Sequence, residues 1–441
     1  MGMLTKNFSQ SKLLVAKVLD QDQRVIRGNL RPVVTASLQH RQRILALTKK
    51  CQTPFYLFDH AAAERSIKAF KSVFTSAIPG LEIFYAVKSN PHQYLLQLAV
   101  KHRLGLDVSS GRELQLAVKS GAKKIVFSGP AKTTAELAMA IKYRRQLVIH
   151  LDSFTELRRL AALLQQRNQT VRAGIRVYTK YHDTWNKFGI PLPELARFFA
   201  LAKRYPRVEL QGLQCHMSWV KGPATYQKML QAIATAVGSL SAADRRRIKF
   251  VDFGGGFEPY RLEGYFPWTL PQGEIIKTAA EALGRPVPFT DKYYLSESVP
   301  LEAYARGIAA AIKKYLRPLV ECVYYCEPGR AISSQSMHLI LQVMDVKNPK
   351  LVILDGGTNM VGYEVFEFFY YPVINLTHPA KREISCHLYG SLCTPYDLFG
   401  FYCYASKMQA GDIIMIPNQG AYTYTLAQNF IKPIPPVHIL K

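Results

Sequence analysis

A lysine at the end of an apolar run is the first residue of this sequence that is placed to do chemistry. Residues 81–87 are mostly apolar or aromatic and read as a short buried strand, and Lys88 follows directly. We expect the apolar surroundings of this amine to lower its pKa. An amine that is neutral part of the time can form a Schiff base with an aldehyde. The alternative is a lysine that only caps a strand and extends into solvent.

Glycines and an arginine follow two later strand-like runs. Gly254, Gly255 and Gly256 come directly after residues 248–253, and Arg330 stands four residues after residues 320–326. Backbone N–H groups of consecutive glycines can converge on a phosphate, and a guanidinium can bind the same group. A tight turn would need only one glycine, so three in succession favour an anion site.

Two further polar residues stand at the ends of predicted strands. Glu327 precedes Pro328 and Gly329 and could pair with a protonated ring nitrogen, and His216 could stack on the face of that ring. Each residue also has a structural explanation, such as a helix cap, a buried histidine or a surface ion pair. Together with Lys88 and the glycines, they fit a phosphorylated pyridine that carries an aldehyde.

The elements that must position these residues alternate between strand and helix. Such alternation is typical of parallel βαβ units, and eight strands are the number that closes a (β/α)8, TIM-like barrel. A ninth strand-like run, residues 54–58, must lie outside the barrel. A doubly wound open sheet is the competing fold, but no Gly-rich turn follows residues 54–58. The eight predicted strands are residues 82–88, 104–109, 124–128, 147–151, 171–178, 208–216, 248–253 and 320–326.

The pattern changes after Arg330, where short strand-like runs replace the helices. We therefore predict an α/β protein whose barrel, residues 51–328, precedes an all-β C-terminal domain, residues 329–441. Residues 1–50 form an N-terminal segment that partly joins the β domain. The stretch 257–319 reads as an insertion over the mouth of the barrel, with a helix near residues 301–315.

Composition narrows the class of protein. The chain has 441 residues and a net charge of +26, which attracts anions, but its basic residues are spread out and no nucleic-acid-binding motif accompanies them. We expect neither a nucleic-acid nor a membrane partner, since no apolar span is long enough for a membrane helix and the N-terminus has no signal-like core. Seven cysteines without CxxC spacing favour the reducing cytoplasm and give no metal site.

The sequence resembles the fold-type III pyridoxal-phosphate decarboxylases, the ornithine/diaminopimelate/arginine decarboxylase family. The resemblance runs from about residue 54 to residue 430 and implies a fold like that of alanine racemase and ornithine decarboxylase. It is carried by Tyr85-Ala86-Val87-Lys88-Ser89-Asn90, residues 106–114, Arg176, Lys187-Phe188-Gly189, the His216 segment, Gly254-Gly255-Gly256-Phe257, Glu327-Pro328-Gly329-Arg330, Asp355-Gly356-Gly357, residues 390–397 and Gly420-Ala421-Tyr422.

The resemblance implies a role for each matching residue toward pyridoxal 5'-phosphate. Lys88 forms the Schiff base, His216 stacks on the ring, and Glu327 pairs with the ring nitrogen. The remaining cofactor-binding residues are Asp107, Arg176, Ser218, Gly254, Gly255, Gly256, Gly329, Arg330 and Tyr422. Cys393 and Asp397 reach the site of a partner subunit, which implies a homodimer with shared active sites. Cys393 also returns a proton to Cα after carbon dioxide leaves.

The substrate end of the pattern departs from the family. The acidic residue that usually follows the reactive cysteine is Thr394 here, and residues 360–371 hold Glu364 and Glu367 but no arginine. The Cys-Thr-Pro variant resembles siderophore-pathway members. It therefore suggests that the small-molecule substrate is an amino-acid conjugate, such as a citryl-diamino acid, that contacts Thr394, Asp397, Glu364 and Glu367.

Four other functions remain open at this point. The chain could be a diaminopimelate decarboxylase of lysine biosynthesis or an ornithine/lysine decarboxylase. It could also be a regulatory relative that has lost its cofactor, although Lys88, Glu327, Cys393 and Tyr422 are all present. A basic nucleic-acid binder is the remaining class, and the absence of a binding motif argues against it.

Overall fold

The computed structural model describes Leu13 and residues 30–182, 187–218, 220–259, 263–265, 271–285, 293–296, 298–362 and 369–440. Within these residues, eight parallel strands close into a barrel, because β5 pairs with β6 and β12 pairs with β2. An open doubly wound sheet is therefore excluded. The barrel strands are β2 (Glu82–Ala86), β3 (Gly105–Val108), β4 (Ile125–Phe127), β5 (Leu147–Leu151), β6 (Val171–Tyr178), β8 (Val208–Gln214), β9 (Phe250–Asp252) and β12 (Val323–Cys326), with β7 (Ile190–Pro191) added beside β6.

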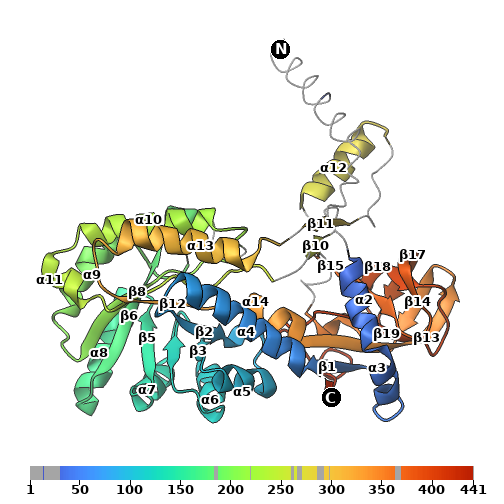
Figure 1. Cartoon of the computed structure of the whole chain (residues 1–441), viewed down its shortest axis with the longest axis horizontal. Helices are drawn as coiled ribbons and strands as arrows, with labels where there is room; N and C mark the ends of the chain where they lie inside the picture. The colour runs from blue at the N-terminus through green and yellow to red at the C-terminus, as the bar shows by residue number, and fades with distance from the viewer. Residues whose placement is uncertain are drawn as a thin grey trace.

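Helices surround the barrel and cover its outer face (Figure 1). Several begin where a short polar side chain accepts an amide N–H of the first turn, as Asp59, Ser110, Thr133 and Ser153 do. These residues satisfy donors that a helix end would otherwise leave open, so they define where these four helices start. The helices are α4 (His60–Ala77), α5 (Gln93–Lys101), α6 (Gly111–Lys119), α7 (Thr134–Lys142), α8 (Phe154–Arg167), α9 (Leu195–Ala202), α10 (Ala224–Gly238), α11 (Ala242–Arg247) and α13 (Leu301–Ala311).

A second sheet of eight strands within the described residues lies beside the barrel, at the right of Figure 1. Its strand β1 precedes the barrel in sequence yet pairs with β13 and β20, so the ninth predicted strand does lie outside the barrel. The boundaries predicted for the domains stay a prediction, although β1 falls inside the range given to the barrel. The strands are β1 (Phe55–Asp59), β13 (Met337–Asn348), β14 (Leu351–Leu354), β16 (Ile374–Asn375), β17 (Pro379–Tyr389), β18 (Leu398–Ala405), β19 (Ile413–Ile416) and β20 (Val437–Leu440).

The N-terminal helices α2 (Arg31–Gln39) and α3 (Arg41–Thr48) pack on the second sheet. Their buried residues Val33, Val34 and Ile44 share one hydrophobic cluster with β1 and β13. A small sheet of β10 (Glu263–Tyr265), β11 (Tyr294–Ser296) and β15 (Phe369–Tyr370), together with α12 (Pro271–Ala282), projects from the junction of barrel and second sheet (Figure 1). No helix in the described part of the chain is both long and apolar enough to cross a membrane.

Aromatic side chains fill part of the barrel interior. Phe84, Val126, Val148 and Phe250 form a separate buried cluster, and the ring of Tyr325 stacks on Phe250 with the ring centroids 4.7 Å apart. A Cβ atom on Gly174 or Gly212 would lie 2.7 or 2.4 Å from the Phe250 ring, so only glycine leaves room for it. This packed layer makes the barrel a closed core rather than a pore.

Candidate active site

A cavity of about 660 Å³ opens where the barrel strands end, and its lining comes from both sheets. That volume lies within the range of small-molecule sites. It is lined by many of the residues that the sequence singled out, which the barrel brings together from distant parts of the chain. They are Lys88, Arg176, His216, Ser218, Gly256, Glu327, Gly329, Arg330 and Tyr422.

Lys88 follows β2 directly, and its Nζ donates a hydrogen bond to Oδ2 of Asp107 at 2.7 Å. Asp107 is completely buried, and its other oxygen accepts a hydrogen bond from Ser128 Oγ at 2.5 Å. Burial lowers the pKa of Lys88, but the carboxylates of Asp107 and Glu327 outweigh it, so the pKa is raised. The expectation that apolar surroundings lower this pKa was therefore wrong: the amine is an ammonium held between carboxylates.

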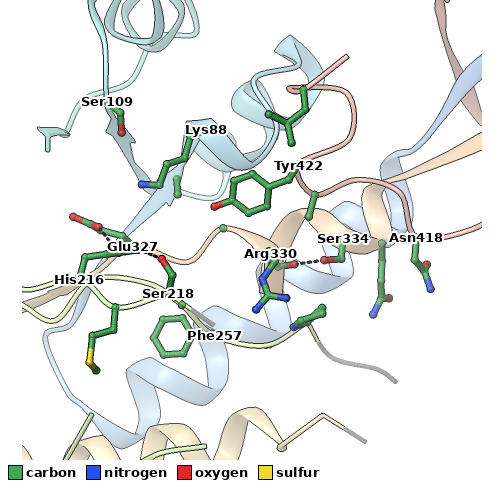
Figure 2. Close-up of a pocket in the computed structure, with 18 of the residues that line it drawn as sticks. Lys88, Ser109, His216, Ser218, Phe257, Glu327, Arg330, Ser334, Asn418 and Tyr422 are labelled. Carbon is green, nitrogen blue, oxygen red and sulfur yellow. Dashed lines mark hydrogen bonds and ion pairs between the residues drawn. The ribbon is translucent and has the colours of Figure 1, made fainter. Parts of the chain in front are cut away.

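Glu327 follows β12, the strand that pairs with β2, so it faces the same cavity as Lys88 (Figure 2). Nε2 of Gln214 lies 3.3 and 3.4 Å from its two carboxylate oxygens. Burial opposes its ionisation, but His216 and the Lys88 ammonium hold the pKa of Glu327 below its usual range. An ionised carboxylate in the cavity wall is suited to pair with a protonated ring nitrogen.

His216 follows β8, and its ring is fixed between the glycine turn and Glu327. Gly255 N–H donates to its Nδ1 at 3.0 Å, the same atom lies 3.3 Å from Glu327, and Ser218 Oγ lies 3.4 Å from Nε2. Figure 2 shows the contacts of His216 with Glu327 and Ser218 on one wall of the cavity. The predicted stacking histidine is thus held in one orientation by its own chain.

The three glycines have a packing role that the sequence did not reveal. Gly254 and Gly256 have φ angles of +70° and +96°, in the left-handed region. A Cβ atom on Gly255 would lie 2.2 Å from the carbonyl oxygen of Glu327, and one on Gly256 would lie 2.2 Å from that of Met217. Of the three, only Gly256 lines the cavity. Close backbone approach therefore requires glycine here whether or not the turn binds a phosphate.

Arg330 lies farther from Lys88 and Glu327 than Tyr422 does, and the Tyr422 ring points toward Lys88 and Glu327 (Figure 2). Tyr422 has a left-handed φ of +58°, and its N–H donates to Ser89 O at 2.8 Å, which ties the second sheet to the loop that carries Lys88. Arg330 begins the short helix α14 (Arg330–Ser333), directly after Gly329. Arginine, tyrosine and serine side chains here are the donors that a phosphate needs.

Arg176 is only 8% exposed and is engaged with its own chain. Its Nη1 donates to Ser128 O at 3.0 Å, and its guanidinium lies 4.3 Å from the ring centroid of Phe188. The sequence placed Phe188 and Lys187 in a family motif without giving either residue a role. Both line the cavity, as do the polar residues Ser109, Gln335 and Asn418 and the apolar residues Leu30, Val33 and Leu295, to which no role was assigned either.

Cys393, Thr394 and Asp397 lie between β17 and β18 and do not line the cavity of their own chain. Cys393 is exposed, whereas Asp397 is 1% exposed. Both carboxylate oxygens of Asp397 accept backbone N–H groups, one from Thr358 and one from Leu392, each at 2.6 Å. Its carboxylate is thus engaged in shaping the loop, which the sequence did not predict. Glu364 and Glu367 lie outside the described residues.

The residues that line the cavity fit pyridoxal 5'-phosphate. The ring nitrogen would meet the Glu327 carboxylate, the aldehyde would meet the Lys88 amine, and the phosphate would meet Arg330, Tyr422 and Ser218. This donor set, an acceptor at one end and several donors at the other, matches the two ends of the cofactor.

Comparisons with known proteins point to the same chemistry. Residues 62–334 match the family model described as "Pyridoxal-dependent decarboxylase, pyridoxal binding domain". The diaminopimelate decarboxylase of Campylobacter jejuni is 28% identical over 402 residues, which cover 87% of this chain and 89% of that protein. That of Helicobacter pylori is 27% identical over 396 residues, which cover 86% of this chain and 88% of that protein.

Solved structures of other decarboxylases have a similar fold to this chain. The structure of the Helicobacter pylori diaminopimelate decarboxylase complexed with L-lysine has a TM-score of 0.72 at 26% identity and covers 90% of this chain and 94% of that one. A lysine/ornithine decarboxylase from Vibrio vulnificus complexed with putrescine has a TM-score of 0.70 at 19% identity over 91% of this chain and 98% of that one, which shows the fold alone. The chain therefore belongs to the pyridoxal-dependent decarboxylase family, and it is a pyridoxal-phosphate-dependent amino-acid decarboxylase.

Proposed function

We propose that the chain decarboxylates diaminopimelate, releasing carbon dioxide and lysine. The relatives that are 24–28% identical over most of the chain are diaminopimelate decarboxylases. The sequence favoured a siderophore-type citryl conjugate instead, and no comparison supports that choice. It rested on single positions such as Thr394, whereas the comparisons weigh the whole chain. The alternative named from the sequence, diaminopimelate, is the better-supported substrate.

The main support for diaminopimelate as the substrate is the charge of the cavity. Among its described lining residues, four are cationic, Lys88, Arg176, Lys187 and Arg330, and Glu327 supplies the single carboxylate. A phosphate would occupy Arg330, and Lys88 is paired with Asp107, so Lys187 and Arg176 supply the positive charge that suits a substrate with a second carboxylate. Diaminopimelate has one at its distal end. Ornithine and lysine carry only a distal ammonium group there, which an acidic side chain would be needed to bind.

The cofactor and the protein would divide the work. Pyridoxal 5'-phosphate, when bound, supplies the electron-withdrawing ring that accepts the electron pair left at Cα when carbon dioxide departs. Lys88 would hold the cofactor through Nζ, and Glu327 would keep a proton on the ring nitrogen. His216 would fix the plane of the ring, and Arg330, Ser218 and Tyr422 would bind the phosphate.

Asp107 is placed to take the proton that Lys88 must lose before its amine can react. The two side chains share a hydrogen bond of 2.7 Å. Burial, reinforced by the charge of Glu327, raises the pKa of Asp107, although Lys88 and Ser128 oppose this. The raised pKa of Asp107 lowers the cost of moving the proton to it, whereas the raised pKa of Lys88 increases that cost. We therefore assign Asp107 the role of proton acceptor for Lys88.

Cys393 would act in the site of a partner subunit in a homodimer. It lies outside the cavity of its own chain, on an exposed turn that also presents Tyr396, which is 66% exposed. A thiol is a suitable acid to return a proton to Cα after decarboxylation. The exposure of this turn supports the assignment, because a group that acts on a second chain must be accessible in its own.

Carbon dioxide release from four substrates tests the proposal. The purified protein with pyridoxal 5'-phosphate is given diaminopimelate, ornithine, lysine or a citryl-diamino acid conjugate, and kcat/KM is compared. We expect diaminopimelate to exceed ornithine and lysine by about a hundredfold or more, as a site that must pair a distal charge discriminates strongly. Equal or faster turnover of the citryl conjugate would instead favour the siderophore-type substrate.

A further inference from the structure

Three side chains form a buried polar cluster beneath Glu327 that the proposed mechanism does not use. Asp252 ends β9, His150 lies in β5 and Gln214 ends β8, and all three are completely buried. A nitrogen of His150 and one carboxylate oxygen each of Asp252 and Glu327 lie within 4.8 Å of one another. None of the three lines the cavity, so none is expected to touch substrate.

The two oxygens of Asp252 differ in their surroundings. Oδ1 accepts a hydrogen bond from Gly254 N–H at 2.8 Å. Oδ2 is reached by no hydrogen-bond donor from the described residues. A charged oxygen without a donor in the protein interior carries a large desolvation penalty. A protonated Oδ2 would instead need an acceptor, and the neighbouring carboxylate of Glu327 is one.

Two buried carboxyl groups this close do not both ionise. Glu327 receives the amide of Gln214 and faces the Lys88 ammonium, whereas Asp252 has no cation beside it: His150 is neutral, because burial lowers its pKa to about 3. Burial, reinforced by the charge of Glu327, raises the pKa of Asp252 well above its usual value. The nearby cations Lys132 and Arg176 act on His150, and Lys132 is paired with Glu156, so neither compensates Asp252. The other ionisable groups near this cluster, Asp107, Cys215, His216, Tyr325 and Cys326, add no positive charge.

We propose that Asp252 is a neutral carboxylic acid whose Oδ2–H is directed at Glu327 and holds that residue in its ionised form. A hydrogen bond to a carboxylate lowers its affinity for a proton. The proton shared between Glu327 and the ring nitrogen would therefore stay on the nitrogen, as electron withdrawal by the ring requires. Asp252 is thus a positioning residue that acts through Glu327. The inference rests on the proposed role of Glu327, but not on the identity of the substrate.

Infrared spectroscopy of the holoenzyme tests the protonation state directly. A protonated carboxyl group has a C=O stretch that is separate from carboxylate bands and shifts in D₂O. We expect such a band near neutral pH in the wild-type protein and its loss in Asp252→Asn. A wild-type spectrum without a band that Asp252→Asn removes overturns the proposal, and the wild-type measurement does not depend on whether a variant folds.

Two substitutions separate the hydrogen bond from packing. In Asp252→Asn the side-chain oxygen can still accept from Gly254 and the amide can still donate to Glu327, so we expect the Kd for pyridoxal 5'-phosphate and its near-visible absorbance to stay within about threefold and unshifted. Asp252→Leu removes the donor, and the Kd should rise about tenfold or more, with a shifted absorbance. Equal effects of the two changes overturn the proposal.

A divalent metal ion is the competing explanation of the cluster, since histidine and carboxylate oxygens are common ligands. Elemental analysis of the same holoenzyme decides between them. We expect no stoichiometric metal. One metal ion per chain that is lost in Asp252→Asn would overturn the neutral acid. Neither measurement uses a substrate, so a failure here is distinguishable from a failure of the diaminopimelate assignment.

Discussion

Nζ of Lys88 lies 2.7 Å from Oδ2 of Asp107, a residue 19 positions later in the sequence. Asp107→Asn removes that charge, and burial, which by itself lowers the pKa of Lys88, is then opposed mainly by Glu327. The pKa of Lys88 should fall, so the amine should react with pyridoxal 5'-phosphate at a pH lower by about one to three units. The rate of cofactor uptake, followed by absorbance across pH, measures the change.

The variant Asp244→Asn, at a buried aspartate that also pairs with a lysine, serves as the matched control for that experiment. Asp244 pairs with Lys203, away from the cavity, and its profile should coincide with that of the wild-type protein. An Asp107→Asn profile with the wild-type midpoint would show that Asp107 does not set the charge of Lys88.

The exposed turn of Cys393 predicts complementation between two defective chains. Lys88→Ala should lose both the near-visible absorbance and turnover, whereas Cys393→Ala should keep the absorbance and lose rate or fidelity. When both chains are co-expressed, half of the dimers are mixed and each mixed dimer has one intact site, so about a quarter of the wild-type activity should return. Carbon dioxide release measures it.

Two controls are needed to interpret the recovered activity. Lys88→Ala expressed alone should stay inactive, and Lys124→Ala, an exposed lysine paired with Glu82, should match the wild-type protein. If the mixed chains recover nothing, Cys393 does not serve a partner's site.

The substitution Asp397→Asn should lower activity without loss of the cofactor. Its two oxygens each accept a backbone N–H, and Asp397→Asn can satisfy only one of them. We expect about 1–3 kcal/mol less stability in urea unfolding, and turnover as low as that of Cys393→Ala with unchanged near-visible absorbance. Asp345→Asn, at an exposed ion pair with Lys347, should leave the urea unfolding midpoint nearly unchanged. Full turnover in Asp397→Asn would rule out a role in presenting Cys393.

Asp59 predicts a pH-dependent contribution to stability. Burial opposes its ionisation, but contacts with His338 and Ala62 N–H lower the pKa of Asp59 to about 2. Because the folded pKa is depressed, the stabilisation is present above the unfolded pKa of about 4 and is lost as pH falls toward 2. Asp59→Asn keeps a cap for α4 but loses the charge, so it should cost about 1–2 kcal/mol near pH 7 after solvent screening.

Urea unfolding of wild-type and Asp59→Asn protein at about pH 7, 5 and 3 checks this prediction. The difference between the two should shrink only at the lowest pH. A difference that is the same at all three would mean that the carboxylate charge contributes nothing.

The barrel could be predicted from the sequence because each of its strands is marked by a local run of apolar residues. All eight strand-like runs are strands of the barrel, since a parallel strand buried on both faces is a continuous apolar run such as Ile83 to Ala86. The candidate residues at the strand ends could be singled out because each one follows such an apolar run. Strand order brings Lys88, His216 and Glu327 to one rim once the barrel closes.

What sequence reasoning missed depends on contacts between distant segments. The pKa of Lys88 was given the wrong direction because desolvation can be inferred from its neighbours, whereas the charge of Asp107 reaches it only across a strand pair. The amides of Thr358 and Leu392 likewise engage Asp397 only after the second sheet folds. Lys187 and Asn418 reach the cavity through loops, whose course no periodicity predicts.

Strand β1 makes the two halves of the molecule inseparable. It is made before the barrel, yet its partners β13 and β20 are made after it, and Asp59 at its end also caps the first barrel helix. A ribosome must therefore finish nearly the whole chain before this strand can find its neighbours, and such distant pairing slows folding. Cutting the chain between β1 and β13 would put β1 in one fragment and its two partner strands in the other. Both fragments would then have unpaired strand edges.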